Sequence, residues 1–157
     1  MTLSVGDRLP EASFMTMTAD GPTKLSTDDV FAGKTVALFA VPGAFTPTCS
    51  AKHLPGFVEK ASEIKAKGVD TIACVSVNDV FVMDAWGKSQ NAEELLMLDD
   101  GNGDFTAALG LELDGTGFGL GKRSQRFAML VDDGTVTHLN VEPGAGVDVS
   151  SADSMLA

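Results

Sequence analysis

The stretch TVALFAVPGAFTPTCSAKHLPGFVEKASEIKAKGVDTIACVSV, residues 35–77, decides the fold. It begins with the apolar run TVALFAV at residues 35–41 and ends with a second one, DTIACVSV at residues 70–77. Such runs are typical of strands that are covered on both faces of a sheet. Between them, apolar residues recur in steps of three and four, at Leu54, Phe57, Val58, Ala61 and Ile64. This spacing indicates a helix that stops at Gly68, and therefore a right-handed β-α-β unit.

The same alternation continues along the chain. Asn78 and Asp79 can cap a helix over residues 80–88, and residues 95–98 look like a third strand. A short helix follows near residues 105–109. Residues 127–131 and 135–141, joined across Asp133-Gly134, predict an antiparallel hairpin. We leave the first 30 residues as irregular, with possible short strands. These elements predict an α/β fold with a largely buried sheet.

Length and charge limit the possible classes of protein. The chain has 157 residues and a mass of 16.3 kDa, with no internal repeat or linker, so we expect a single domain spanning residues 1–157. With 44% hydrophobic residues it has the composition of an ordinary globular protein. A net charge of −11 repels phosphate groups, so nucleic acid and anionic membranes are not expected partners.

The start of the chain and its cysteines suggest a compartment. Residues 1–10, MTLSVGDRLP, contain no apolar segment of the signal-peptide kind, and the longest apolar run, residues 36–42, is too short for a membrane span. We therefore expect no export and no membrane anchor. Two cysteines do not suggest a disulfide framework, which favours a reducing, cytoplasmic compartment.

A proline-rich loop follows the first buried strand and leads to Cys49. In β-α-β units such loops lie beyond the carboxyl ends of the strands, where ligands gather. Pro42, Pro47 and Pro55 are three of the six prolines in the chain, and we expect Pro55 to bend the helix that follows. A thiol at the start of a helix is favoured as an anion by the helix dipole. The alternative is that Cys49 is a small buried hydrophobic residue.

A cluster of cations precedes the hairpin. Lys122, Arg123 and Arg126 fall within five residues of an otherwise acidic chain. Lys122 and Arg123 have the pattern of a solvated charged loop. Arg126 adjoins the strand that begins at Phe127, so its guanidinium can point inward toward an anion such as a thiolate.

The loop resembles a known active site. VPGAFTPTCS at residues 41–50, followed by KHLPG at residues 52–56, resembles the active-site stretch of the peroxiredoxins, whose signature is Pro-x-x-x-Thr-x-x-Cys. Further stretches resemble the type II branch, which is similar to plant glutaredoxin-linked enzymes: SVND at 76–79, FVM at 81–83, ALGLEL at 108–113, RFA at 126–128 and VSSAD at 149–153. The resemblance implies a thioredoxin-like fold, with a central mixed β-sheet flanked by helices.

The resemblance also implies the activity and the site. It implies a thiol-dependent peroxidase that reduces hydrogen peroxide and alkyl hydroperoxides, with Cys49 as the peroxidatic residue that becomes a sulfenic acid. Arg126 would contact both thiolate and peroxide, Thr46 would hydrogen-bond the peroxide, and Pro42 would shield the pocket from water. No metal or organic cofactor is implied. A homodimer is implied, with the region of Phe81 and Trp86 near its interface.

The sequence favours an external reductant. The tail at residues 146–151, GVDVSS, lacks the resolving cysteine of some type II relatives. Cys74 lies inside a predicted strand, about 10 Å below its carboxyl edge at about 3.3 Å per residue, so we interpret it as a core residue. The resemblance suggests glutathione with glutaredoxin as the reductant, and thioredoxin is the alternative.

Two other classes of function compete with the peroxidase. Cys49 with His138, or with His53 one turn away, would match a cysteine hydrolase. A non-enzymatic thiol sensor or holdase would keep its function without Cys49.

Two further motifs are weak. The alternating glycines at residues 115–121 lack the spacing and context of a dinucleotide site. Asp100, Asn102 and Asp104 match part of a calcium loop, but Phe105 replaces the required glycine, so we predict a polar turn.

Overall fold

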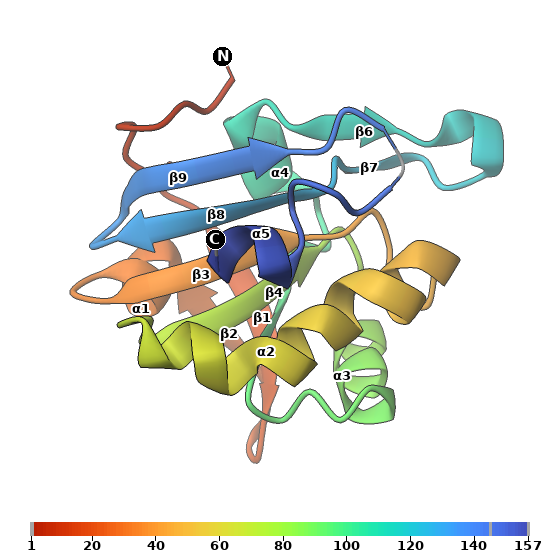
Figure 1. The fold of residues 1–157 in the computed structure, drawn as a ribbon. Helices are drawn as coiled ribbons and strands as arrows, with labels where there is room; N and C mark the ends of the chain where they lie inside the picture. The colour runs from red at the N-terminus through yellow and green to blue at the C-terminus, as the bar shows by residue number, and fades with distance from the viewer. Residues whose placement is uncertain (1, 145, 157) are drawn as a thin grey trace.

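The fold is built on a mixed β-sheet. The computed structural model describes residues 2–144 and 146–156. Within them, seven strands form one sheet in the order β2-β1-β5-β4-β3-β8-β9 (Figure 1). The strands are β1 (Ser13–Thr18), β2 (Gly21–Ser26), β3 (Thr35–Ala40), β4 (Thr71–Ser76), β5 (Leu96–Asp99), β8 (Phe127–Asp132) and β9 (Thr135–Val141). β3 pairs with β4 in parallel and with β8 in antiparallel orientation. The predicted mixed sheet is confirmed.

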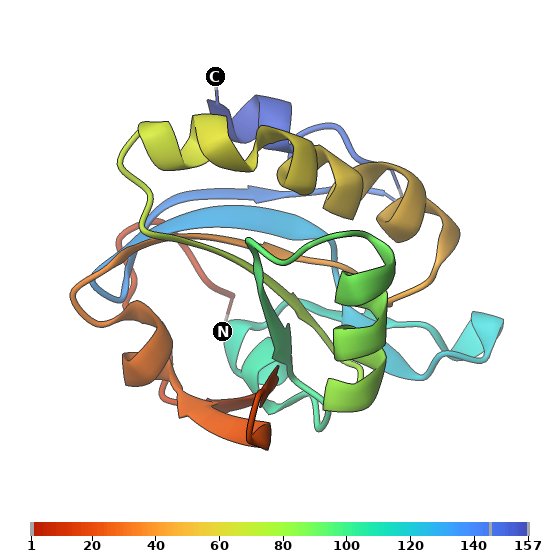
Figure 2. The ribbon, with the colours of Figure 1, turned by 90° about the horizontal axis from the view of Figure 1, so that it is seen from below.

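Helices cover both faces of this sheet. They are α1 (Thr27–Phe31), α2 (Leu54–Ala66), α3 (Val80–Ser89), α4 (Asp104–Leu109) and α5 (Ala152–Leu156). α2 and α5 lie over one face, and α1 and α4 over the other (Figure 2). Val36, Leu38 and Ala40 of β3 pack in the hydrophobic cluster of α1 and α4. Ala37 and Phe39 pack in the cluster of α2 and α3. This alternation explains why the strand is apolar at nearly every position.

The β3-α2-β4 unit was predicted with its boundaries nearly correct. β3 and β4 differ from the predicted strands by one residue at each end or less, and α2 ends two residues before Gly68. The hairpin of β8 and β9 turns at Asp133 and Gly134, which both have positive φ, 48° and 83°, as a type I′ turn requires. Asp79 caps α3, because its side chain accepts a hydrogen bond from Val82 N.

Two regions are more regular than the sequence indicated. The N-terminal segment forms the β1-β2 hairpin, which occupies one edge of the sheet and pairs with β5 through Met15 and Asp99. Residues 112–124 form an arm of β6 (Glu112–Asp114), the 3-10 turn η2 (Thr116–Phe118) and β7 (Lys122–Ser124). The arm extends from the main body of the molecule (Figure 1). The predicted polar turn at residue 100 serves as a cap, since Asp100 accepts from the backbone of Phe105 and Thr106.

The bend expected at Pro55 takes a different form. Residues Cys49–His53 form a single π-helical turn, η1, and α2 follows directly from it. Residues 47–66 are helical without a break, so Pro55 removes one backbone donor from inside a continuous helix, two residues after the π turn. The irregular backbone is therefore located at Cys49 itself, and π turns within helices are rare and often mark functional sites.

Among the described residues, no helix is both long and apolar enough to cross a membrane.

Candidate active site

The site is located beyond the carboxyl end of β3, where Cys49 meets a residue from β8. Cys49 follows the loop of residues 42–48 and begins the π turn η1. Its side chain is fully buried, at 0% exposure. Arg126, which directly precedes β8, places Nη2 at 3.0 Å from Cys49 Sγ. The antiparallel pairing of β3 with β8 puts Phe127 opposite Ala40, so the sheet itself carries Arg126 to this edge.

The loop before Cys49 is shaped by close contacts. The Thr46 hydroxyl donates to Gly43 O at 2.6 Å. A Cβ atom at Gly43 would lie 3.0 Å from Thr46 Cγ2 and 3.2 Å from Arg123 Nη1, so only glycine fits without a shift. Ala44 N donates to Asn78 Oδ1 at 3.0 Å, which ties the loop to the start of α3. The loop is therefore held by contacts within itself and by a hydrogen bond to the segment that leads into α3.

Arg126 is buried and only partly used by other protein groups. Its side chain is 5% exposed. Nη1 contacts His53 Nδ1 at 2.8 Å, and Nη2 contacts the sulfur. Among the described residues, Arg126 Nε has no hydrogen-bond partner. A buried guanidinium N–H without a partner is rare in folded proteins, and a bound ligand or water is a usual reason for one.

His53 is held as a neutral imidazole. Its Nε2 lies 2.9 Å from Ser150 O, and a carbonyl can only accept, so Nε2 carries the proton. Nδ1 then has a free lone pair and accepts from Arg126, which can only donate. The pKa of His53 is lowered to about 4, mainly by burial and also by the nearby Arg126 charge, while the hydrogen bond to Ser150 and the charge of Glu142 act in the opposite direction.

A cavity of about 540 Å³ opens beside this cluster. Pro42, Thr46 and Arg126 line it from one side. Leu113 and Phe118 line it from the arm, together with Glu112, Asp114 and Gln125. The Cys49 sulfur is located behind the wall, in contact with the same guanidinium that faces the cavity.

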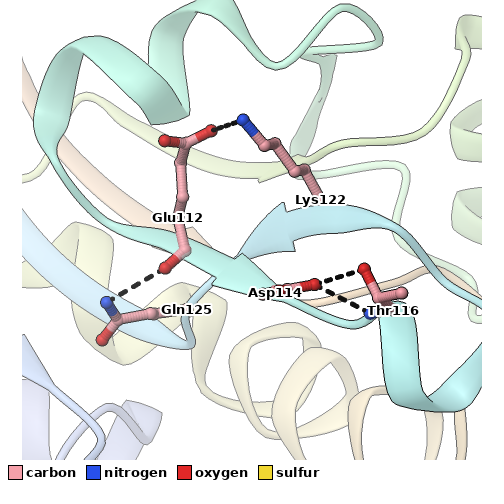
Figure 3. Close-up of polar contacts among 5 residues, drawn as sticks. All are labelled: Glu112, Asp114, Thr116, Lys122 and Gln125. Atoms are coloured by element: carbon pink, nitrogen blue, oxygen red, sulfur yellow. Dashed lines mark hydrogen bonds and ion pairs between the residues drawn. The ribbon is translucent and has the colours of Figure 1, made fainter.

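Polar contacts hold the arm that forms the far wall (Figure 3). Gln125 Nε2 donates to Glu112 O at 3.3 Å, and the Glu112 carboxylate lies 4.0 Å from Lys122 Nζ. Asp114 Oδ1 accepts from Thr116 N at 3.0 Å and also from the Thr116 hydroxyl. These contacts leave Phe118, at the tip, 88% exposed.

The structure does not bring His138 into the site. His138 lies on β9, opposite Leu130 of β8. Leu130 is four residues after Arg126, which corresponds to about 13 Å along the strand. Its side chain is exposed. His53 is close, but its Nδ1 lone pair is occupied by Arg126. Neither histidine is therefore placed as a base for Cys49.

Arg123 and Cys74 lie nearby in other environments. Arg123 was expected in a solvated loop, and this is wrong: it lies on β7, and its side chain is half-buried and donates to Leu120 O and Pro42 O. The two backbone carbonyls take the place of water as partners of the Arg123 guanidinium.

Cys74 is fully buried in β4, opposite Phe39. Burial raises the pKa of the Cys74 thiol well above its ordinary value.

Two residues of the site, Ser150 and Glu142, were not singled out by the sequence, and His53 was considered only as the base of a cysteine hydrolase. His53 and Glu142 contact Arg126, and Ser150 contacts both of them, although nothing in their local spacing predicts this meeting. Trp86 Nε1 donates to Ser50 Oγ at 3.0 Å, which links α3 to the π turn. Among the described residues, no group of three His, Cys, Asp or Glu side chains is placed to hold a metal ion.

Comparisons with known proteins place the chain in a family. The Redoxin family matches residues 4–156. The chain is 53% identical to Peroxiredoxin-2B of Arabidopsis thaliana, over 98% of this chain and 96% of that protein. It is 51% identical to the chloroplastic Peroxiredoxin-2E of the same plant, over 99% of this chain and 68% of that protein.

A solved structure is also similar. Reduced Prx3 of Vibrio vulnificus, in complex with hydrogen peroxide, superposes with a TM-score of 0.96 at 56% identity, covering 99% of this chain and 98% of that one.

The buried neutral His53 predicts a pH dependence of stability. Its folded pKa, about 4, is below the unfolded value of about 6.5, so the unfolded state takes up the proton first and stability falls as pH drops below about 6.5. From pH 7.5 to 5.5 this amounts to about 1 kcal/mol. We expect urea unfolding to show this loss in the wild type and not in His53→Gln.

Both pH values lie above the isoelectric point of about 4.3, and the exposed His138 is common to both proteins. Equal losses in the wild type and in His53→Gln would contradict the assignment of His53 as neutral and buried.

Proposed function

The chain belongs to the redoxin family and is a peroxiredoxin, a thiol-dependent peroxidase, and on that premise we propose that Cys49 is its peroxidatic residue. The observation that carries this proposal is the 3.0 Å contact between Cys49 Sγ and Arg126 Nη2. A guanidinium stays charged at all working pH values and stabilises an anionic sulfur next to it.

The reaction is an in-line displacement on oxygen. The Cys49 thiolate attacks one oxygen of the peroxide, the O–O bond breaks, and a proton joins the departing oxygen. The products are Cys49 sulfenic acid and water, or an alcohol when the substrate is an alkyl hydroperoxide. Negative charge grows on the departing oxygen, so donors fixed in advance around it lower the barrier.

We assign Arg126 as the main donor. Its Nη2 is next to the sulfur, and its Nε, buried and without a protein partner among the described residues, can donate to a peroxide oxygen. One side chain can therefore stabilise both the attacking sulfur and the peroxide.

Thr46 supplies an acceptor. Because its hydroxyl proton is already donated to Gly43 O, the oxygen keeps lone pairs for the peroxide O–H. Pro42 lines the same cavity without an N–H of its own, and we propose that it limits the entry of water.

The substrates we propose are hydrogen peroxide and alkyl hydroperoxides. The similar Vibrio protein was solved with hydrogen peroxide. Leu113, Phe118 and Pro143 give the cavity an apolar side that suits an alkyl group. Because the sulfur is located behind the cavity wall, the peroxide must pass between Pro42, Thr46 and Arg126 to reach it.

Stopped-flow mixing of reduced protein with hydrogen peroxide tests these roles. We expect Cys49→Ser to show no reaction and Arg126→Ala to react about 100- to 1,000-fold more slowly, since one donor to a developing anion is lost. Thr46→Val should be slower than wild type, and Thr46→Ser close to it. Cys74→Ser is the matched control and should react normally.

A normal rate in Arg126→Ala would contradict the assignment of the guanidinium. Reaction in Cys49→Ser would contradict the assignment of the sulfur.

We further propose that an external thiol reduces the Cys49 sulfenic acid back to the thiol. Cys74 is fully buried in β4, two residues or about 7 Å before the strand ends, and its side chain is part of the core between the sheet and α2. A bridge between the cysteines would need Cα atoms within about 7 Å and suitable directions. Glutathione with glutaredoxin is the proposed reductant, with thioredoxin as the alternative. Both belong to a reducing compartment, which is why we propose a cytoplasmic location.

Mass spectrometry of the oxidised protein tests how the Cys49 sulfenic acid is reduced. After one equivalent of peroxide without thiol, Cys49 should carry a sulfenic acid that dimedone traps. Glutathione should then give a mixed disulfide at Cys49, and glutaredoxin should remove it. Cys74→Ser should behave in the same way. A Cys49 to Cys74 bridge as the main product would exclude the external reductant.

We also propose a homodimer. Phe45 and Phe81 are 55% and 63% exposed. They belong to segments beside the active site that the Ala44 to Asn78 hydrogen bond ties together. Trp86, on the same helix as Phe81, is fully buried, whereas Phe81 is mostly exposed. Exposed aromatic side chains grouped in this way suit an interface.

Sedimentation analysis tests the dimer. Phe45→Ser with Phe81→Ser should shift the chain from dimer to monomer. Val5→Ser, which changes an equally exposed apolar residue (60%) elsewhere, should leave it unchanged. A monomeric wild type would refute the proposal.

A further inference from the structure

The carboxylate of Glu142 holds the C-terminal segment next to Arg126. Glu142 follows β9, and its N–H donates to Arg126 O at 2.9 Å, so the two residues are joined across the strand ends. The side chain is 5% exposed. Its Oε2 accepts from Asp148 N at 2.7 Å, Ser150 N at 2.8 Å and Ser150 Oγ at 2.6 Å. A single oxygen therefore fixes the segment that returns over the site.

These contacts determine where the Ser150 carbonyl is placed. Ser150 is fully buried, and with its N–H and hydroxyl both donated to Glu142, its carbonyl oxygen lies 2.9 Å from His53 Nε2. As the carbonyl takes the Nε2 proton, the Nδ1 lone pair is left to accept from Arg126 Nη1. The order of contacts is Glu142, Ser150, His53, Arg126 and Cys49.

The aromatic surroundings leave His53 few other orientations. The rings of Phe39 and Phe57 have centroids 4.9 Å and 5.6 Å from the His53 ring, and these two rings stack on each other at 4.0 Å. The ring therefore lies against this stacked pair of apolar side chains, and the polar contacts at its two nitrogens decide its tautomer. With the other tautomer, an N–H at Nδ1 would point at a guanidinium N–H, and Arg126 would have to move.

We propose that Glu142 is a positioning residue of the peroxidase reaction, which holds the Ser150 carbonyl against His53 and so fixes the direction in which Arg126 presents its guanidinium to Cys49. This proposal rests on the role proposed above for Arg126. Displacement of a catalytic group by about 1 Å can cost about 100-fold in rate. The carboxylate acts through Ser150, His53 and Arg126, which lie between it and the sulfur.

A double-mutant cycle with stopped-flow kinetics tests the proposal. Glu142→Ala should lower the rate constant with hydrogen peroxide about 10- to 100-fold in the wild-type background. In the Arg126→Ala background the same change should alter the rate less than about twofold, because the residue it positions is gone. Glu94→Ala removes an exposed carboxylate that pairs with Lys65 far from the site, and it should have no effect in either background.

Spectroscopy of His53 gives a second readout that a merely structural role would not change. The ¹⁵N shifts of the ring should show a protonated Nε2 and an unprotonated Nδ1 in the wild type, and a mixture of tautomers in Glu142→Ala. If Glu142→Ala does not fold, Glu142→Gln keeps the shape and weakens the three hydrogen bonds, and it should show smaller changes of the same kind.

Two outcomes would overturn the proposal. One is a wild-type rate and tautomer in a folded Glu142 variant. The other is an equal loss of rate in both backgrounds, which would mean that Glu142 acts independently of Arg126. A wild-type rate in Arg126→Ala alone would instead refute the proposed role of Arg126, so the two failures can be told apart.

Discussion

The contact between the Arg126 guanidinium and the buried Cys49 sulfur is the interaction on which the rest of the site depends. The two residues are separated by 77 positions in the chain, and only the sheet brings them together. β8 lies next to β3, so the residue before β8 comes to the edge from which the cysteine loop leaves. In a site with no exposed sulfur surface, the charge of the guanidinium is poorly screened, so its effect on the sulfur is correspondingly strong.

Burial also explains why the surroundings of the pair are so constrained. A buried guanidinium needs a partner for each of its donors, and here a neutral imidazole and a sulfur take two of its N–H groups. A protonated His53 would repel the guanidinium and could not accept from it. The low pKa of His53, caused first by burial, is therefore compatible with a fixed arginine. The loop is fixed by Gly43, Thr46 and Asn78, so the wall of the cavity that it forms with Arg126 is held in place on the loop side too.

The sequence predicted the elements with strong periodicity and the residues with local signatures. The two buried strands at residues 35–41 and 70–77 and the helix between them have patterns that do not depend on distant partners. The Pro-x-x-x-Thr-x-x-Cys spacing marks Cys49 and Thr46 in the same local way. Arg126 was singled out because it is a cation at the start of a strand.

The remainder depends on tertiary contacts that no local pattern encodes. β1 alternates methionine and threonine at residues 15–18, and β2 begins with Gly21 and Pro22, so this hairpin was left as possible short strands. Arg123 looked solvated because the carbonyl of Pro42 that it contacts is 81 residues away in the chain. Glu142 and Ser150 lie in an ordinary acidic and serine-rich tail, and their meeting with His53 becomes visible only when the chain is folded.

The most direct test of the central claim is the ultraviolet absorbance of the thiolate near 240 nm, followed as a function of pH in the Cys74→Ser background. The chain contains no tyrosine, so Cys49 is then the one side chain whose ionisation dominates this signal. The account predicts that the absorbance rises at a lower pH with Arg126 present than in Arg126→Ala. Identical curves would mean that the guanidinium does not stabilise the sulfur anion, and would contradict the account.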